Sequence, residues 1–403
     1  MFFHHFLKRF VKIGTLNLID KCGKNHCYSA TQTPKITIQL HSKSLERRLY
    51  HSPILALGEG YMEGHITIEK GDIYDFLAFC AVNLQKFNPP LVEKLTDQLS
   101  SLRRLLHEKN PIHKSHKNVA HHYDLSEDLY RLFLDKDMQY SCAYFKSLDD
   151  DLETAQENKK RHLAAKLQLK SGQKVLDIGS GWGGLAISLA REANIDVTGL
   201  TLSEEQHKVA TERAKAAGLE DRVRFCLRDY REEMGTYDRI VSVGMFEHVG
   251  VKHYSEFFSQ ISSLLRADGI ALLHSIGCSS GPTTPNSWLK KYIFPGGYAP
   301  ALSETLSALE PSKLYVTDIE ILHQHYAETL RHWRTRFLAH QNKVKEIWGE
   351  KFFRMWEFYL ASCEIAFRKR GYMVFQMQMM RDPELAPLTR DYIWEEEENS
   401  CQW

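Results

Sequence analysis

Two apolar stretches in the middle of this 403-residue chain end in side chains that can carry a proton. The stretch 238–243 leads into Glu247 and His248, and the stretch 270–276 contains His274. If both stretches are strands of one parallel sheet, their ends point into one crevice, where a carboxylate and imidazoles can act as acids and bases. A purely structural core would not choose these residue types, so the pattern indicates an enzyme.

A glycine-rich turn follows another apolar stretch, which is typical of a buried parallel strand. The residues after it resume helical spacing from Leu185, and a strand that passes through glycines into a helix brings its backbone close to a ligand. The glycines are Gly179, Gly181, Gly183 and Gly184. Because three of them also fit the G-x-G-x-x-G spacing of dinucleotide binders, the turn alone leaves the ligand open.

The end of the next predicted strand, 196–202, helps to identify the class of ligand. A nicotinamide-binding fold usually presents an acid at the tip of this strand for the ribose hydroxyls. Here the tip is Thr201, and Glu204 and Glu205 fall in the first turn of the following helix, where they favour the helix dipole. The sequence therefore argues against a dehydrogenase.

The elements that position these residues alternate between strand and helix. Strands are predicted at 174–179, 196–202, 223–228, 238–243, 270–276 and 314–321, with 371–379 as a seventh. This alternation predicts an α/β fold with a mainly parallel, doubly wound sheet. An aromatic insert at 288–300 should overhang the carboxyl ends of the strands, where ligands bind in such sheets.

A smaller α/β domain is predicted at residues 1–107. Strands are expected at 15–19, 35–40 and 65–69 and helices at 42–57 and 72–83, with the polar stretch 21–34 as the turn between the first two strands. No catalytic cluster falls here, so the domain is interpreted as a binding or docking module. Beyond it we expect a His/Lys-rich linker at 108–123, a catalytic domain at 124–394 and a solvated acidic tail at 395–403.

Several features leave alternatives open. The Phe-rich, basic residues 1–12 predict an amphipathic helix, either at a bilayer surface or docked on its own domain. The linker is either an exposed segment or a basic surface for phosphates, with zinc binding less favoured. Cys22, His26 and Cys27 fit a polar hairpin tip better than a metal site, since no fourth ligand is evident. No metal is therefore expected.

Composition excludes some classes of function. A formal net charge of +1 provides no global field for nucleic acid. The eight cysteines form no C-x-x-C pair, which favours a reducing, cytoplasmic compartment. No apolar run approaches the roughly 20 residues of a membrane span.

Several separated motifs resemble those of the cyclopropane-fatty-acyl-phospholipid synthases, an S-adenosylmethionine-dependent family that includes the mycolic acid cyclopropane synthases. The resemblance covers about residues 118–380, and one departure is Ser180, where the family more often has cysteine. The N-terminal part matches more loosely, at Gly58-Glu-Gly-Tyr-Met-Glu-Gly. The main motifs are His122-Tyr-Asp-Leu, Met138-Gln-Tyr-Ser-Cys-Ala-Tyr, Val175-Leu-Asp-Ile-Gly-x-Gly-Trp-Gly-Gly, Thr201-Leu-Ser-x-x-Gln, Asp229-Tyr-Arg, the stretch 238–250, Lys291-Tyr-Ile-Phe-Pro-Gly-Gly, Tyr326-x-x-Thr-Leu and Gln376.

The resemblance implies a Rossmann-like class I methyltransferase fold, a lipid-associated N-terminal domain and S-adenosyl-L-methionine as cofactor. The cofactor contacts that it implies are Tyr140, Ser141, Val175, Leu176, Asp177, Ile178, Gly179, Ser180, Gly181, Trp182, Gly183, Thr201, Leu202, Ser203, Glu204, Glu205, Gln206, Leu227 and Arg228.

It further implies transfer of the sulfonium methyl to a cis double bond of an unsaturated phospholipid acyl chain, followed by ring closure. The proton acceptor would be a bicarbonate ion held by Cys142, Glu247, His274, the backbone of Ile276, and Tyr326. Cys363 matches a cysteine considered as a nucleophile in the family, but its helical setting favours packing. Because water would destroy a carbocation, an aromatic wall is expected. Candidates are Tyr292, Phe294, Tyr298, Phe246 and Trp333, although Trp333 also fits a plain helix core.

Two alternative functions stay open. The same site could yield a methyl-branched or methylene chain, or a lipid-binding homologue could keep the fold without turnover. The resemblance also suggests a homodimer and a cytoplasmic protein associated peripherally with the inner membrane surface.

Overall fold

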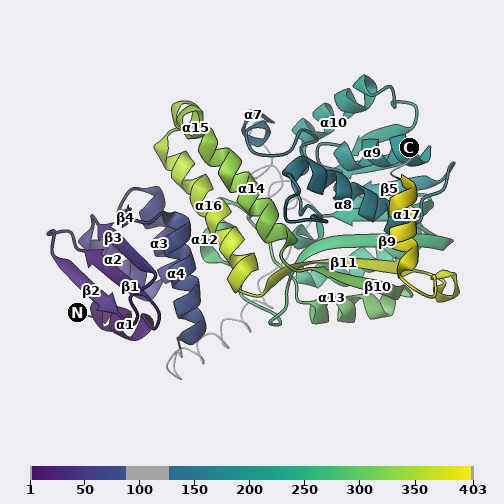
Figure 1. The fold of residues 1–403 in the computed structure, drawn as a ribbon. Helices are drawn as coiled ribbons and strands as arrows, with labels where there is room; N and C mark the ends of the chain where they lie inside the picture. The colour runs from purple at the N-terminus through teal and green to yellow at the C-terminus, as the bar shows by residue number, and fades with distance from the viewer. Residues whose placement is uncertain (1, 88–126, 401–403) are drawn as a thin grey trace. The chain divides into compact units, whose positions relative to one another are not determined.

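The computed structural model describes residues 2–87 and 127–400, which divide into two compact units (Figure 1). The first unit holds 2–87, 284–294 and 330–372, and the second holds 127–283, 295–329 and 373–400. The predicted catalytic domain 124–394 is thus not one compact unit, because helix α16 (Glu350–Lys369) packs against the N-terminal helices α3 (Pro53–Met62) and α4 (Ile73–Lys86). The predicted linker 108–123 lies outside the described residues.

The first unit contains a four-stranded sheet in the order β2-β1-β3-β4. Strand β1 pairs antiparallel with β2 and parallel with β3. The expectation of a simple turn at 21–34 is wrong, since that stretch includes β2. Its side chains are mostly exposed and only Tyr28 is buried, so hydrophobic alternation gave no signal. The strands are β1 (Thr15–Ile19), β2 (Asn25–Ser29), β3 (Lys35–Leu40) and β4 (Ile66–Lys70).

The helices of this unit come partly from the N-terminal residues and partly from later segments of the chain. The helix predicted at 42–57 is two helices, because Pro53 begins α3. Helix α1 buries Phe3, Leu7 and Phe10, as expected of a helix docked on its own domain. The helices of this unit are α1 (Phe2–Phe10), α2 (Lys43–His51), α3, α4, α12 (Ser287–Tyr292), most of α14 (His325–Ala339), α15 (Gln341–Trp348) and α16.

The motif around Gly58 has a packing role in this unit. A β-carbon on Gly58 would collide with the indole of Trp288, and one on Gly60 would lie 2.9 Å from Ile66. Between them, the buried carboxylate of Glu59 accepts hydrogen bonds from Lys291 Nζ at 2.7 Å and from the Tyr292 hydroxyl at 2.9 Å. The motif therefore fixes α12 against α3.

The second unit contains the predicted seven-stranded sheet, in the order β10-β11-β9-β8-β5-β6-β7. Strands β9, β8, β5, β6 and β7 are mutually parallel, and β10 pairs antiparallel with β11. The strands are β5 (Lys174–Ile178), β6 (Asp196–Thr201), β7 (Val223–Leu227), β8 (Tyr237–Val243), β9 (Leu265–Cys278), β10 (Tyr315–Leu322) and β11 (Tyr372–Met380). The α/β, doubly wound fold class is confirmed.

Apolar residues on both faces of this sheet build two cores. Val175 packs with α8, α9 and α10 on one face, while its neighbour Leu176 packs with α11 on the other, as the two-residue period of a strand requires. Figure 1 shows α8 and α9 on one side and α13 on the other. The helices are α7 (Glu127–Arg131), α8 (Leu152–Leu167), α9 (Gly184–Ala193), α10 (Glu204–Ala216), α11 (Tyr254–Leu264), α13 (Leu302–Leu309) and α17 (Asp391–Ser400). Short 3-10 turns lie at Tyr230–Glu232, Phe246–His248, Val251–His253, Glu310–Ser312 and Pro383–Leu385.

The expectation of a solvated acidic tail is wrong for its described part. Residues up to 400 form α17, which packs on α8. The Glu397 side chain is 1% exposed, and its carboxylate contacts His162 Nδ1 at 2.5 Å and Lys146 Nζ at 2.6 Å. A run of acids could not reveal that one of them is buried against basic partners elsewhere in the chain.

Candidate functional site

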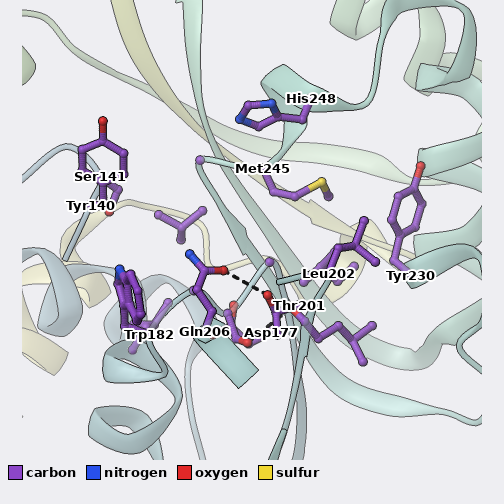
Figure 2. A pocket seen from close by; sticks show the side chains of 18 of the residues that line it. Tyr140, Ser141, Asp177, Trp182, Thr201, Leu202, Gln206, Tyr230, Met245 and His248 are labelled. Carbon is purple, nitrogen blue, oxygen red and sulfur yellow. Dashed lines mark hydrogen bonds between the residues drawn. The ribbon is translucent and has the colours of Figure 1, made fainter. Parts of the chain in front are cut away.

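A pocket in the second unit opens at the carboxyl ends of β5, β6 and β8 (Figure 2). The strand ends Ile178, Thr201 and Val243 all line it. Further lining comes from residues 138–141 before α8, the turn 179–182, residues 228–231 after β7, and residues 244–249 in part. This is the edge of an open α/β sheet at which ligands bind.

The glycine turn is shaped by its backbone. Gly179 and Gly181 adopt φ angles of +84° and +54°, a region that disfavours side chains. The N–H groups of Gly179 and Ser180 both donate to the carbonyl of Leu200, at 3.0 and 2.8 Å. The turn is thereby tied to β6, and a β-carbon added at Gly181 would meet no atom within 4 Å. Gly181 is therefore where a ligand can approach the bare backbone.

Most of the expected cofactor contacts line the pocket. The lining includes Tyr140, Ser141, Asp177, Ile178, Gly179, Ser180, Gly181, Trp182, Thr201, Leu202, Gln206 and Arg228.

The other expected contacts lie elsewhere. Val175 and Leu176 are core residues of β5, and a β-carbon on Gly183 would press on Phe225. Ser203 caps α10 through the N–H of Gln206. Glu204 and Glu205 lie in the first turn of that helix, and Leu227 is 45% exposed on β7. The family resemblance implied whole stretches of sequence as cofactor contacts. Only some residues of each stretch face the ligand, so residues of the core and of the helix start were included as well.

Charged and polar side chains converge on the pocket. Burial raises the pKa of Asp177 to about 7, opposed by the charge of Lys159. One oxygen of this carboxylate, Oδ2, has no hydrogen-bond partner among the described residues. The Thr201 hydroxyl donates to Gln206 Oε1 at 3.0 Å, which leaves the amide nitrogen of Gln206 toward the cavity (Figure 2). Burial lowers the pKa of His248 to about 4, so that its imidazole is neutral at physiological pH.

The donor set fits S-adenosylmethionine. An unpartnered carboxylate suits an ammonium group, and a neutral imidazole does not repel a sulfonium. Apolar and aromatic walls for the rest of the molecule come from Tyr140, Trp182, Tyr230 and Met245.

The residues expected to hold bicarbonate all belong to the second unit, and two of them, Glu247 and Ile276, are in contact. The N–H of Ile276 donates to Glu247 Oε1 at 2.6 Å, and Glu247 Oε2 has no partner among the described residues. Burial raises the pKa of Glu247 to about 7. His274 lies two residues before Ile276 on the same face of β9, and burial lowers its pKa well below the usual value.

Two other contacts involve these residues or their neighbours in the chain. Gln376 Nε2 lies 3.2 Å from His274 Nδ1, so Gln376 orients the imidazole. The segment that carries Cys142 is tied to the start of α14, because the N–H of Ala143 donates to the Thr329 hydroxyl at 3.0 Å. This contact sets Tyr326, three residues earlier on α14, beside that segment.

The remaining candidates do not line the pocket. Cys363 belongs to the first unit, in α16, and burial raises the pKa of its thiol to about 12, which fits packing and not nucleophilic attack. Trp333 is fully buried, as expected of a core residue. Tyr292 binds Glu59, and Phe294 lies against Tyr359, with ring centroids 5.6 Å apart.

In the second unit, Phe246 is fully buried and stacks on Tyr254, and the Tyr298 hydroxyl donates to Glu304 at 2.7 Å. Neither ring lines the described pocket.

Several residues that line the pocket had no predicted role. Met138, Gln139, Met245, Pro295 and the stretch 229–231 appeared only as parts of motifs, with no role of their own. Asp229 to Arg231 follows β7 directly, so its place after a strand was an available signal. For Gln139 the motif was the signal, but its role depends on its contact with Lys159 of α8.

Comparison with known proteins identifies the family. A model of the mycolic acid cyclopropane synthetases matches residues 111–377, and a model of a domain of unknown function matches residues 2–88. The cyclopropane-fatty-acyl-phospholipid synthase of Escherichia coli K12 is 38% identical over 347 residues, 86% of this chain and 88% of that protein. A probable fatty acid methyltransferase of Pseudomonas putida is 36% identical over 84% of this chain and 85% of its own length.

Solved structures agree. The mycolic acid cyclopropane synthase CmaA1 complexed with SAH and CTAB superposes with a TM-score of 0.63 at 32% identity, over 66% of this chain and 97% of that one. Fold and site together define an S-adenosylmethionine-dependent methyltransferase of class I. The chain belongs to the mycolic acid cyclopropane synthetase family.

Proposed function

We propose that this chain is a cyclopropane-fatty-acyl-phospholipid synthase. It adds a methylene group, taken from S-adenosylmethionine, to the cis double bond of an unsaturated phospholipid acyl chain, and a bound bicarbonate accepts the proton released on ring closure. The observation that carries the proposal is the Glu247 carboxylate, which is 8% exposed and has one oxygen on the Ile276 N–H and one without a partner among the described residues.

The pocket residues would hold the cofactor in the following way. Asp177 would accept hydrogen bonds from the ammonium group of the cofactor. Gln206 and the bare backbone at Gly181 would contact other polar parts of the cofactor, and the aromatic walls would exclude water. When bound, S-adenosylmethionine supplies an electrophilic methyl group. An alkene is a poor nucleophile, so the protein must hold it against that methyl.

The cluster around Glu247 handles the proton. Because the pKa of Glu247 is raised to about 7, its carboxyl group carries a proton for part of the time at neutral pH. A protonated Glu247 can donate to bicarbonate, and an ionised Glu247 can accept from it. His274 is neutral and adds no charge of its own. Gln376 Oε1, which is buried and unpartnered among the described residues, supplies a further acceptor.

A diffusible base has a chemical advantage here. A protein carboxylate in contact with a carbocation risks alkylation, whereas a lost bicarbonate is replaced from solution. Glu247 is held back from such contact by its bond to the Ile276 backbone. This arrangement supports Glu247 as a holder of the base.

A second candidate is a fatty-acid methyltransferase that yields a methyl-branched or methylene chain. It is favoured by the 36% identity to the Pseudomonas putida protein and the 35% identity to the tuberculostearic acid methyltransferase UfaA1 of Mycobacterium tuberculosis. Both candidates share the methyl transfer and differ in the fate of the cation. A lipid-binding protein without turnover is disfavoured, since such a protein has no need of a buried carboxylate.

The fatty-acid methyl esters of a bacterial host that expresses this chain would decide between them. We expect ring-bearing chains heavier than the host's monoenes by one CH₂, and no such chains from the matched Glu247→Gln variant. Methyl-branched or methylene products would instead support the second candidate. Unchanged chains with a folded, cofactor-binding protein would contradict both.

Bicarbonate is tested with the purified enzyme. Turnover should fall in buffer stripped of carbon dioxide and return when bicarbonate is added. Full turnover without bicarbonate would mean that a protein side chain takes the proton.

Association with a membrane is a further part of the proposal. A phospholipid substrate requires that a cytoplasmic enzyme approach the inner membrane surface, as a monomer or as a homodimer. Among the described residues, no helix is long and apolar enough to cross a bilayer. Co-sedimentation of the full chain with phospholipid vesicles, and its mass by light scattering, would test peripheral binding and dimerisation.

A further inference from the structure

Helix α8 carries three buried lysines, and one of them differs from the others. Lys160 has carboxylates of Asp137 at 3.0 Å and Glu157 at 2.7 Å, and Lys166 has that of Glu320 at 2.5 Å. Lys159 is fully buried, yet no carboxylate among the described residues lies within 4.0 Å of its nitrogen. The carboxylates of Asp135 and Asp137 act on Lys159 only from a longer distance. A buried ammonium group without a carboxylate in contact is costly, which suggests a function for it.

The hydrogen bonds of Lys159 lead to the pocket. Its Nζ donates to Gln139 Oε1 at 2.5 Å and to Ser141 Oγ at 2.9 Å, and both of these residues line the cavity. These acceptors are neutral. Since Ser141 Oγ already accepts from Lys159, its own hydroxyl hydrogen is left to donate outward. A donor whose oxygen is polarised by an ammonium group is suited to an anion.

A carboxylate, whose charge is opposite to that of Lys159, lines the cavity. Asp177 has a carboxylate oxygen without a partner among the described residues, and Lys159 lowers the pKa of this carboxyl group electrostatically. Lys159 also acts on Cys142 and His274. Asp177 lines the cavity and Lys159 stands behind Ser141, so the site offers a carboxylate and a hydroxyl donor polarised by an ammonium group. These two groups complement an ammonium and a carboxylate on one ligand.

We propose that Lys159 is a positioning residue that provides the counter-charge for a carboxylate-type anion, acting through the hydroxyl of Ser141. Two ligands of this enzyme carry such a group: the amino-acid end of the cofactor, and bicarbonate. The second source rests on the proposed function, whereas the first rests only on cofactor binding.

The test compares two ligands in the wild type, two single variants and their double variant. Binding of S-adenosylhomocysteine and of its decarboxylated analogue, which keeps the amine, is measured by calorimetry for the wild type, Lys159→Met and Ser141→Ala. We expect each substitution to weaken S-adenosylhomocysteine binding by about tenfold to a hundredfold and to leave the analogue nearly unaffected. In the double variant the two losses should not add, because they break one relay.

Lys166→Met is the matched control. It removes a buried lysine from the last turn of the same helix, about two turns from Lys159, so that it should lower the melting temperature and change the affinity for S-adenosylhomocysteine far less than Lys159→Met does. If Lys159→Met fails to fold, Ser141→Ala still tests the relay, since Ser141 is only partly buried.

Other outcomes identify the anion or overturn the inference. If binding of S-adenosylhomocysteine is unchanged but the bicarbonate concentration for half-maximal turnover rises about tenfold or more, the anion is bicarbonate. Equal losses for both adenosyl ligands, or no change in either adenosyl binding or bicarbonate requirement, would refute a counter-charge role. The adenosyl measurements do not involve lipid, so a failed product analysis would leave them interpretable.

Discussion

Replacing Glu247 by glutamine should make the protein more stable and nearly inactive. Glutamine has almost the same shape, and its Oε1 can accept the N–H of Ile276 as the carboxylate does at 2.6 Å. The oxygen at the second position has no partner among the described residues, so the amide placed there breaks no hydrogen bond. What the substitution removes is the charge and the exchangeable proton.

The size of the effect follows from the pKa of the carboxyl group. Burial raises the pKa of Glu247 from 4.5 to about 7, which corresponds to about 3 kcal/mol at roughly 1.4 kcal/mol per unit. Because the folded state holds the proton more tightly than the unfolded state, ionisation destabilises the fold. The cost is absent below pH 4.5 and complete above about pH 7. Glutamine carries no such cost at any pH.

Denaturant unfolding at pH 5 and pH 8 would measure this difference. The variant should exceed the wild type by up to about 3 kcal/mol at pH 8 and by much less at pH 5. Turnover should fall sharply in the variant, and affinity for S-adenosylhomocysteine should stay near that of the wild type. A variant that is less stable at pH 8 would refute the reasoning, because it would mean that the ionised carboxylate makes a stabilising contact.

Other substitutions test the remaining parts of the site. Gly179→Val should abolish S-adenosylhomocysteine binding and also cost about 2 kcal/mol of stability, seen by calorimetry and thermal unfolding, since φ is +84° and a β-carbon would lie 2.8 Å from Met245. Gln206→Ala should weaken binding by about 1–2 kcal/mol in the same titration. Cys363→Ser should keep most of the turnover, and a dead but folded variant would revive the nucleophile hypothesis. Glu397→Ala should lower the free energy of unfolding by about 3 kcal/mol, because His162 would lose a buried partner.

The sequence predicted the strands of the seven-stranded sheet, but it did not predict how the chain divides into two units. Buried parallel strands such as β5 and β6 are short apolar runs with glycines or capping residues at their ends, and these signals are local. The packing of α16 on α3 and α4 joins residues about 300 positions apart in the chain. No local pattern records such a contact, so a contiguous domain was the natural prediction.

The same limit applies to α1. Its Phe and Leu residues predicted an apolar face, and burial of Phe3, Leu7 and Phe10 shows that this face is used within the first unit. Replacing these residues by serine would therefore unfold the unit before it tested membrane binding. Amphipathic periodicity predicts that a face is covered, but it carries no information about what covers it.

In the site, family motifs located the pocket residues but not the groups that set their charge. The motif 138–144 includes Gln139 and Ser141, yet its polarity depends on Lys159, which stands in α8 outside every motif. Likewise, the imidazole of His274 is held by Gln376 of β11, which lies about 100 positions later in the chain. Such partners become adjacent only when strand order and helix packing are fixed.

Helix α8 connects these observations. In one turn of this helix, Lys159 contacts Ser141 at the pocket and Lys160 contacts Asp137. In the following turns, His162 contacts Glu397 of α17 and Lys166 contacts Glu320 of β10. Asp137 in turn accepts from Gln139 at 2.9 Å, so two neighbouring lysines hold the two ends of one loop. The orientation of Ser141 toward the cavity therefore depends on how firmly α8 is seated. Because α17 helps to seat it through Glu397, the C-terminal helix supports the cofactor pocket without lining it.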